Sequence, residues 1–202
     1  LLLKQRKVDS GEILLNGINL NDIPFDVLTK KIGFINHNAY VFNGTIEENI
    51  RMGKNDASLE EIYDALKKAN LYEFVMTLPN KLKTNVGEGG SLLSGGQKQR
   101  ISIARALIVE PELLILDDAL SAVDAKTEEA ILSNLKETRQ EKTTIITAHR
   151  LSSVMHAKEI LVLDEGKIIE RGTHQELLAQ KGWYQRMWEK QQLEAKIEGS
   201  ES

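Results

Sequence analysis

A serine and two glycines stand where the sequence predicts the start of a helix, in Leu93-Ser94-Gly95-Gly96-Gln97. Glycine leaves the backbone uncovered, so N–H groups at the positive end of a helix can approach a phosphate closely, and the serine hydroxyl adds a further donor. A loop followed by an ordinary helix cap would use the same residue types. Because five residues are specified together, we favour phosphate binding for this segment.

Two carboxylates, Asp117 and Asp118, directly follow the apolar residues 113–116. An apolar run bounded by acids is typical of a strand buried in a parallel sheet, and α/β folds bind ligands where such strands end. At that position Asp117 can hold a magnesium-bound water, and Asp118 can orient or deprotonate an attacking water. Acids also end strands simply to meet solvent, and for this pair alone that interpretation is favoured.

His149 closely follows the β-branched residues 143–147, which predict another strand. An isolated histidine at the end of a strand is usually a surface or packing residue. Beside residues 93–97 and 113–118, a functional role for His149 is favoured instead.

The composition is that of one globular unit, which can be built from two lobes. The chain has 202 residues, 41% of them hydrophobic and 28% charged, with no cysteine. These values exclude a disordered, collagen-like or disulfide-bonded chain, and the apolar runs are far shorter than the roughly 20 residues of a membrane-spanning helix. The net charge of -4 gives no global attraction to nucleic acid, and we expect no such partner.

Periodicity and start signals predict strands that alternate with helices. Ser or Thr stands three residues before Glu or Gln, as in a capping box that begins a helix, at Thr45, Ser58, Ser94 and Thr173. Residues 1–4 look like the middle of a helix, and Pro24 predicts a first helical position. The predicted helices cover residues 24–31, 94–108 and 124–138, and residues 45–77 look like a helical lobe. Residues 12–17 predict a strand and a turn, and further strands are predicted at 32–35, 113–116, 143–147 and 160–163. The alternation favours a parallel α/β layer, followed by a hairpin turn at Glu165-Gly166.

In their order and spacing these segments resemble the nucleotide-binding domain of ATP-binding cassette (ABC) transporters, and the resemblance covers essentially the whole chain. The matching motifs are the signature (93–97), the Walker B strand (113–117), the D-loop (121–124), the switch histidine His149, an X-loop of exporter type (84–90) and the Q-loop region (32–35 and 42–50). Several motifs in register carry the resemblance, whereas no single motif would.

The resemblance implies an α/β fold of the P-loop NTPase (RecA-like) type, a parallel sheet with an inserted helical subdomain. It divides the chain into a partial RecA-like and β region with the Q-loop (1–45), the helical subdomain (46–86), the signature helix with the remaining core (87–175) and a C-terminal helical tail (176–202). We expect residues 198–202 to be a disordered end.

The resemblance also implies the ligands and partners. The cofactors would be ATP and Mg2+, bound between two such domains that face head to tail. The second domain would be a hetero-partner, and the coupling helices of a transmembrane domain would contact this chain at the cytoplasmic face of the plasma membrane.

By the same resemblance, Asp118 and His149 take the catalytic positions. Asp117 would hold Mg2+ through a water, and His37 stands at the Q-loop position beside the metal. The residues in nucleotide-contacting positions are His37, Ser94, Gly95, Gly96, Gln97, Asp117, Ser121 and Asp124.

Three departures from the family pattern bear on activity. The phosphate-binding loop (Walker A), with its lysine, is missing, and the pattern would place it just before Leu1; we therefore expect this chain by itself to be inactive. His37 replaces the Q-loop glutamine and follows Asn36 where proline is usual. Asp118 replaces the general-base glutamate.

The effect of Asp118 in place of glutamate on the rate can be estimated from its length. Its carboxylate is withdrawn by about one carbon–carbon bond, and a misplacement of roughly 1 Å can cost about 100-fold in rate. His37 also replaces an amide that both donates and accepts with a ring that can carry charge. An altered Q-loop and a shortened base beside an intact signature resemble the weaker half of heterodimeric ABC exporters.

Two other functions stay open. A regulatory module that holds ATP and seldom hydrolyses it is favoured by Asp118. A soluble ABC ATPase of DNA repair or translation is disfavoured, because only a compact stretch separates His37 from Ser94 and because residues 84–90 resemble an exporter X-loop.

Overall fold

The computed structural model describes residues 1–200. Contacts within the chain divide it after Thr147 into two compact units, and each is described by itself. The finer boundaries predicted after residues 45, 86 and 175 stay predictions. Within the described residues, no helix combines the length and the apolar composition that crossing a membrane requires.

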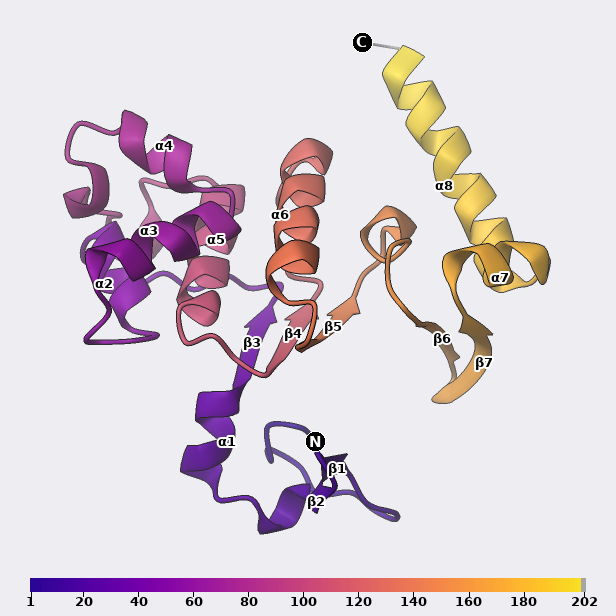
Figure 1. The fold of residues 1–202 in the computed structure, drawn as a ribbon. Helices are drawn as coiled ribbons and strands as arrows, with labels where there is room; N and C mark the ends of the chain where they lie inside the picture. Colours follow the sequence, from indigo (N-terminus) through magenta and orange to yellow (C-terminus); the bar gives the residue numbers. More distant parts are fainter. Residues whose placement is uncertain (201–202) are drawn as a thin grey trace. The chain divides into compact units, whose positions relative to one another are not determined.

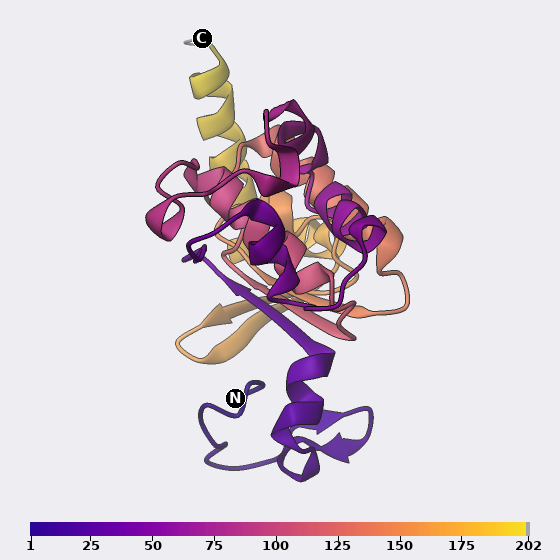
Figure 2. The same ribbon diagram turned by 90° about the vertical axis from the view of Figure 1, so that its left-hand side faces the viewer.

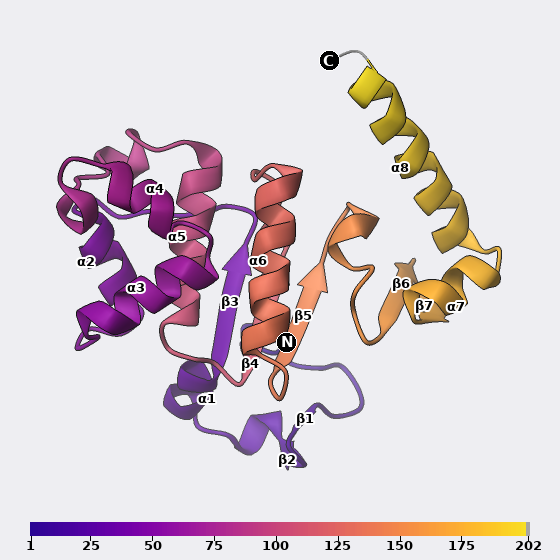
Figure 3. The same ribbon diagram turned by 45° about the horizontal axis from the view of Figure 1, so that its top comes forward.

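A parallel sheet forms the centre of the first unit (Figures 1 and 3). Its order is β3 (Ile32–Asn36), β4 (Leu113–Asp117) and β5 (Thr143–Thr147), as the predicted strands require. α5 (Gly95–Leu107) and α6 (Ala125–Thr138) each lie between two of these strands in the sequence. This arrangement confirms the predicted parallel α/β layer.

Alternate residues of β4 face two different apolar clusters. Leu114 and Leu116 belong to a large cluster that includes Ile131 of α6. Leu113 and Ile115 belong to a smaller cluster formed with the N-terminal segment. Because side chains alternate along a strand, an uninterrupted apolar run is what a strand covered on both faces needs.

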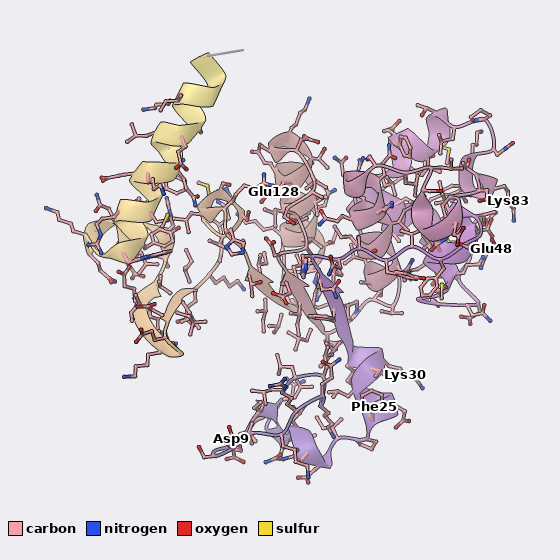
Figure 4. The ribbon with its side chains drawn as sticks, turned by 180° about the vertical axis from the view of Figure 1, so that it is seen from behind. Asp9, Phe25, Lys30, Glu48, Lys83 and Glu128 are labelled. Atoms are coloured by element: carbon pink, nitrogen blue, oxygen red, sulfur yellow. The ribbon has the colours of Figure 1, made fainter. Side chains whose placement is uncertain are left out.

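The helical region packs on α5 (Figure 2). It consists of α2 (Ile46–Arg51), α3 (Leu59–Lys68) and α4 (Tyr72–Thr77), followed by single 3-10 turns η2 (Lys81–Lys83) and η3 (Glu88–Gly90). All four predicted capping boxes are present, and they begin α2, α3, α5 and α7. Glu48, which closes the first of these boxes, is labelled in Figure 4 with Lys83 of the same region.

Arg105 of α5 holds the segment that follows β3 by its backbone. Its guanidinium donates to the Tyr40 carbonyl at 2.9 Å and to the backbone and side-chain oxygens of Asn49 at 2.8 and 2.9 Å. The buried Asn49 amide in turn donates to the Phe42 carbonyl at 2.9 Å and accepts from the Phe42 N–H at 2.9 Å. Burial lowers the pKa of Arg105, and the uncharged acceptors satisfy its donors.

The start of the chain differs from the sequence prediction. Residues 1–4 form a turn and not a helix, with the Lys4 N–H donating to the Leu1 carbonyl at 2.8 Å and Lys4 at a φ of 55°. The Lys4 ammonium donates to the carbonyls of Asn21 and Ile23. The predicted helix is wrong here because one turn makes too few hydrogen bonds to offset its nucleation, whereas these tertiary contacts fix a turn.

The N-terminal elements that follow agree with the prediction apart from one boundary. The paired strands β1 (Leu14–Leu15) and β2 (Ile18–Asn19) lead through a 3-10 turn η1 (Leu20–Asp22) to α1 (Phe25–Lys31). Pro24 is the N-cap residue of α1 and not its first helical residue, so the helix begins one residue later than predicted.

The second unit contains the predicted hairpin. β6 (Ile160–Asp164) and β7 (Lys167–Gly172) run antiparallel through Glu165 and Gly166, whose positive φ values of 45° and 76° suit a two-residue hairpin turn. The prediction that β6 continues the parallel alternation is wrong for the described residues, where β6 pairs with β7 in a separate two-stranded sheet, because the two-residue turn brings β7 antiparallel to it.

The rest of this unit is helical. It comprises the 3-10 turn η4 (Leu151–Ser153), α7 (His174–Ala179) and α8 (Trp183–Ser200). The disordered end predicted from residue 198 is wrong for residues 198–200, which continue α8, and residues 201–202 lie outside the described residues.

Arg139 joins the end of α6 to the starts of two strands. Its guanidinium donates to the Pro111 carbonyl at 2.9 Å, the Thr143 carbonyl at 3.1 Å and the Thr144 hydroxyl at 3.1 Å. The residue is only 7% exposed, so water cannot readily replace these donors.

We expect Arg139→Met to lower the free energy of unfolding by about 2 kcal/mol, because it leaves buried carbonyls without a donor. Chemical denaturation monitored by circular dichroism measures the change. Lys136→Met, on the exposed side of the same helix, is the control. Equal stability of the two variants would show that the Arg139 hydrogen bonds contribute nothing net.

Candidate functional site

The carboxyl ends of the parallel strands bring polar residues into one row. Asn36, Asp117 and Thr147 are direct partners in the register of β3, β4 and β5. His37 and Asp118 are the next residues along the first two strands. Carboxyl ends of parallel strands are the edge at which α/β folds bind ligands.

The Thr147 hydroxyl connects both carboxylate residues of β4. It donates to Oδ1 of Asp117 at 2.6 Å and accepts from the Asp118 N–H at 3.2 Å. The second oxygen of the exposed Asp117 carboxylate is left for other ligands. One hydroxyl therefore fixes the orientation of the first carboxylate and the backbone of the second.

Asp118 leaves the strand in a left-handed conformation, with a φ of 50°. Among residues other than glycine, Asp and Asn adopt this conformation most readily. The Asp118 N–H also donates to the Thr147 carbonyl at 3.1 Å, and its own carbonyl accepts from the Ser121 hydroxyl at 3.0 Å. These bonds turn the chain sharply from β4 into the predicted D-loop.

The start of α5 has the chemistry of an anion site. The Ser94 hydroxyl accepts from the Gln97 N–H at 3.3 Å, and the Gln97 side chain accepts from the Ser94 N–H at 2.9 Å. Because the hydroxyl accepts in this box, its own proton stays available for donation. Gly95 and Gly96 occupy the first turn, where backbone N–H groups have no intrahelical acceptor.

Gly96 is required by the close approach of the D-loop segment. A Cβ at this position would meet the Ala122 carbonyl oxygen at 2.9 Å, which is closer than real Cβ contacts. Gly95 faces the Ala122 side chain at an ordinary 3.5 Å. The glycines therefore serve packing between two predicted motifs as well as access to a ligand.

Gln99 connects three of the predicted motifs. Its side chain is 1% exposed; it accepts from the Ala122 N–H at 3.0 Å and donates to the His37 carbonyl at 3.5 Å. The signature helix is thereby tied to the D-loop and to the Q-loop position. His37 itself is exposed.

Asp124 caps α6 at the end of the D-loop. Its carboxylate accepts from the Thr127 N–H at 2.9 Å. This bond, together with a second hydrogen bond from the Thr127 hydroxyl, holds the pKa of Asp124 below its ordinary value. A lowered pKa means that the cap stabilises the fold at neutral pH and is lost as the pH falls through that pKa.

His149 belongs to the second unit, and its surroundings are described within that unit. It is exposed, and its carbonyl accepts from the Gln191 side chain at 2.8 Å. The geometry given above for Asp117 and Asp118 therefore does not include His149.

Sequence reasoning missed Thr147, Gln99 and Gln191. A signal existed for Gln99, because it shares the buried face of α5 with Ile103 and Leu107 at helical spacing, and a polar residue on an apolar face needs a partner. Thr147 and Gln191 carry no local signal, because their partners are distant in sequence.

Comparisons with a family model and with curated proteins match this chain to ABC transporters. A sequence model described as ABC transporter matches residues 1–121. The chain is 52% identical over 198 residues to the probable multidrug resistance ABC transporter ATP-binding/permease protein YheI of Bacillus subtilis (strain 168), covering 98% of this chain and 34% of that protein. It is 43% identical over 198 residues to the multidrug resistance-like ATP-binding protein MdlA of Escherichia coli (strain K12), again covering 98% and 34%.

A solved structure of a bacterial Atm1-family ABC exporter with ATP bound superposes with a TM-score of 0.90 at 39% identity, covering 94% of this chain and 34% of that chain. The match confirms the predicted P-loop NTPase fold with its parallel sheet. The chain thus spans about a third of the length of the relatives it matches.

We expect Thr147→Val to lower the free energy of unfolding by about 1 kcal/mol, because both hydrogen bonds of the hydroxyl are lost, and Thr147→Ser to retain most of it. Denaturant midpoints measure both. Thr143→Val, on the same face of β5, controls for the preference of valine for strands. A Thr147→Val effect equal to that of the control would contradict the bridging role.

Proposed function

This chain belongs to the ABC transporter family, and on that premise we propose that it is the ATP-binding domain of an ABC exporter. Two such domains, facing head to tail, would bind and hydrolyse ATP between them and couple this to transport across a membrane. The printed names of the multidrug relatives, which join ATP-binding to permease parts, support an exporter.

The capped start of α5 carries the proposal. Ser94, Gly95 and Gly96 present a hydroxyl and backbone N–H groups at the positive end of a 13-residue helix, which suits the phosphates of a nucleotide. In a head-to-tail pair this surface would complete the site of the partner domain. The partner would supply the phosphate-binding loop of that site.

The strand ends would serve the site built on this chain. Asp117 fits Mg2+, which favours one or two carboxylates and keeps several waters, because one carboxylate oxygen is held by Thr147 and the other is available. Bound Mg2+ would neutralise charge that develops on the phosphate oxygens. Ser121 and Asp124 would position the D-loop against the partner, and His149 would contact the γ-phosphate.

Asp118 would be a slow general base. Its side chain is one methylene shorter than glutamate, and its backbone is fixed in a left-handed turn by Thr147 and Ser121. The turn prevents the backbone from advancing to compensate for the shorter side chain. We therefore propose that this chain carries the weaker site of a hetero-pair.

Contact with the transmembrane domain would involve the segment after His37. Tyr40, Phe42 and Met52 are 63%, 40% and 55% exposed, although Arg105 holds the backbone of Tyr40 and Asn49 that of Phe42. Apolar side chains on a rigid surface suit the coupling helices of a permease part. That contact would lie at the cytoplasmic face of the membrane.

A regulatory module that holds ATP with little hydrolysis is the second candidate. The one observation in its favour is Asp118 in its constrained turn. The two candidates differ in whether the assembled pair turns over ATP and drives transport.

We expect Ser94→Arg to reduce the steady-state ATPase rate of the complete protein with its natural partner by more than about tenfold. The arginine would place a bulky cation where the hydroxyl and the helix N–H groups should meet the phosphate. Asp118→Ala and His149→Ala should each leave more than about half of the rate, because they affect only the weaker site.

The comparison is made at equal assembly of the pair. Ser133→Arg, which adds the same charge on the exposed side of α6, serves as the control. If Asp118→Ala is as damaging as Ser94→Arg, this chain carries a fully working site and the asymmetric proposal is wrong. If no variant changes the rate, the ATPase proposal itself fails.

We further expect Asp118→Glu to raise single-turnover hydrolysis at the site built on this chain, because the longer side chain restores the reach of the carboxylate to the water. The left-handed turn should make the same change lower the free energy of unfolding by up to about 1 kcal/mol. An unchanged rate would show that His37 or the partner's signature limits the site instead.

A further inference from the structure

A side chain of the last helix holds the backbone around the switch histidine. Gln191 of α8 donates from Nε2 to the His149 carbonyl at 2.8 Å, and its Oε1 accepts from the Leu151 N–H at 2.9 Å. These two bonds lie on either side of Arg150. One amide group therefore fixes the chain before and after a single residue, 42 positions away in sequence from His149.

The segment leads into a short 3-10 turn whose first N–H needs an acceptor from outside the turn. Arg150 precedes the short 3-10 turn η4, and an arginine side chain carries no acceptor, so the Gln191 side chain accepts from the first N–H of η4, that of Leu151. Leu151 is 6% exposed and anchors the turn in the apolar cluster beneath α8. The position of residues 149–151 thus depends on the packing of the Leu151 side chain and on the hydrogen bonds of the Gln191 amide.

The helix that carries Gln191 is itself fixed. Tyr184, Trp188 and Gln191 follow the i, i+4, i+7 spacing of one helix face, and Tyr184 is fully buried. The Glu170 carboxylate of β7 accepts from the N–H groups of Trp183 and Tyr184, the latter at 3.0 Å. Gln191 is the polar member of a face that is otherwise apolar, and the neighbouring Gln192 is exposed.

We infer that Gln191 is a positioning residue, which fixes the backbone of residues 149–151 and so determines where His149 presents its imidazole. The inference rests on the proposed function, in which His149 contacts the γ-phosphate. Both halves of the amide are needed, because the carbonyl of His149 requires a donor and the N–H of Leu151 requires an acceptor. The C-terminal helix thereby determines the position of the residue that, in the proposed function, contacts the γ-phosphate.

The experiment compares Gln191→Ala, Gln191→Glu and the control Gln192→Ala in the complete protein. The first readout, taken without nucleotide, is hydrogen exchange of the Leu151 amide. We expect it to accelerate about fivefold to tenfold in Gln191→Ala, and to stay near the wild-type rate in Gln191→Glu, which keeps an acceptor for that N–H. Gln192→Ala should not change it.

The second readout is single-turnover hydrolysis of Mg-ATP at the site built on Asp117. Gln191→Ala and Gln191→Glu should both lower the maximal rate by about tenfold with little change in KM, because a displaced imidazole acts on the transition state more than on binding. The loss in Gln191→Glu, despite protected Leu151, separates positioning from a general weakening of the fold.

The outcomes are distinct. Unchanged hydrogen exchange of the Leu151 amide in Gln191→Ala would overturn the inference. So would a hydrolysis rate of Gln191→Ala equal to that of Gln192→Ala, provided that His149→Ala is slowed at the same site. If His149→Ala itself hydrolyses normally, the proposed role of His149 fails. In that case the histidine Cε1–Hε1 NMR signal of His149 decides the inference, which stands if Gln191→Ala shifts the signal and falls if it does not.

Discussion

Burial of both faces of β4 is the constraint on which the candidate site depends. Leu114 and Leu116 enter the large cluster and Leu113 and Ile115 the smaller one, so the strand cannot slip by one residue without exchanging its two sets of side chains. Asp117 is the first residue beyond this buried run. Its place in the row with Asn36 and Thr147 follows from the same register.

The loops at this edge are held by side chains that bind backbone groups. Gln99 ties the Q-loop position and the D-loop to α5, Arg105 ties the segment after β3 to the same helix, and Thr147 holds the turn at Asp118. Each bond provides a side-chain partner for a backbone group of a loop. The signature helix, the Q-loop position, the D-loop and the turn at Asp118 are therefore connected within the first unit.

The hydrogen bonds that hold the turn at Asp118 also bear on the proposed difference between the two ATP sites. Asp118 stands in a left-handed turn that favours Asp or Asn over longer side chains. The capped start of α5 has no such departure, and in the proposed function its glycines and serine meet a partner's phosphate. On that proposal, one chain serves a partner's site well and its own site poorly, because the two functions use different surfaces.

Much of the fold followed from local sequence. The four capping boxes, the apolar run at residues 113–116 and the turn at Glu165-Gly166 each act over a few residues, so their structures could be predicted. The family resemblance came from motifs in register, and the placement of Asp117 at a strand end followed from the pattern as well.

Other features depend on partners that are distant in the sequence. The turn at residues 1–4, the pairing of β6 outside the described three-stranded sheet and the left-handed Asp118 differ from, or were absent from, the sequence prediction. The bonds of Thr147 to Asp117, of Gln99 to Ala122 and of Gln191 to His149 span 30, 23 and 42 positions. The sequence by itself determined the elements and the residue types at their ends. Only the tertiary structure decided which side chains hold the loops between them, because a hydrogen bond forms between groups that folding brings together, whatever their separation along the chain.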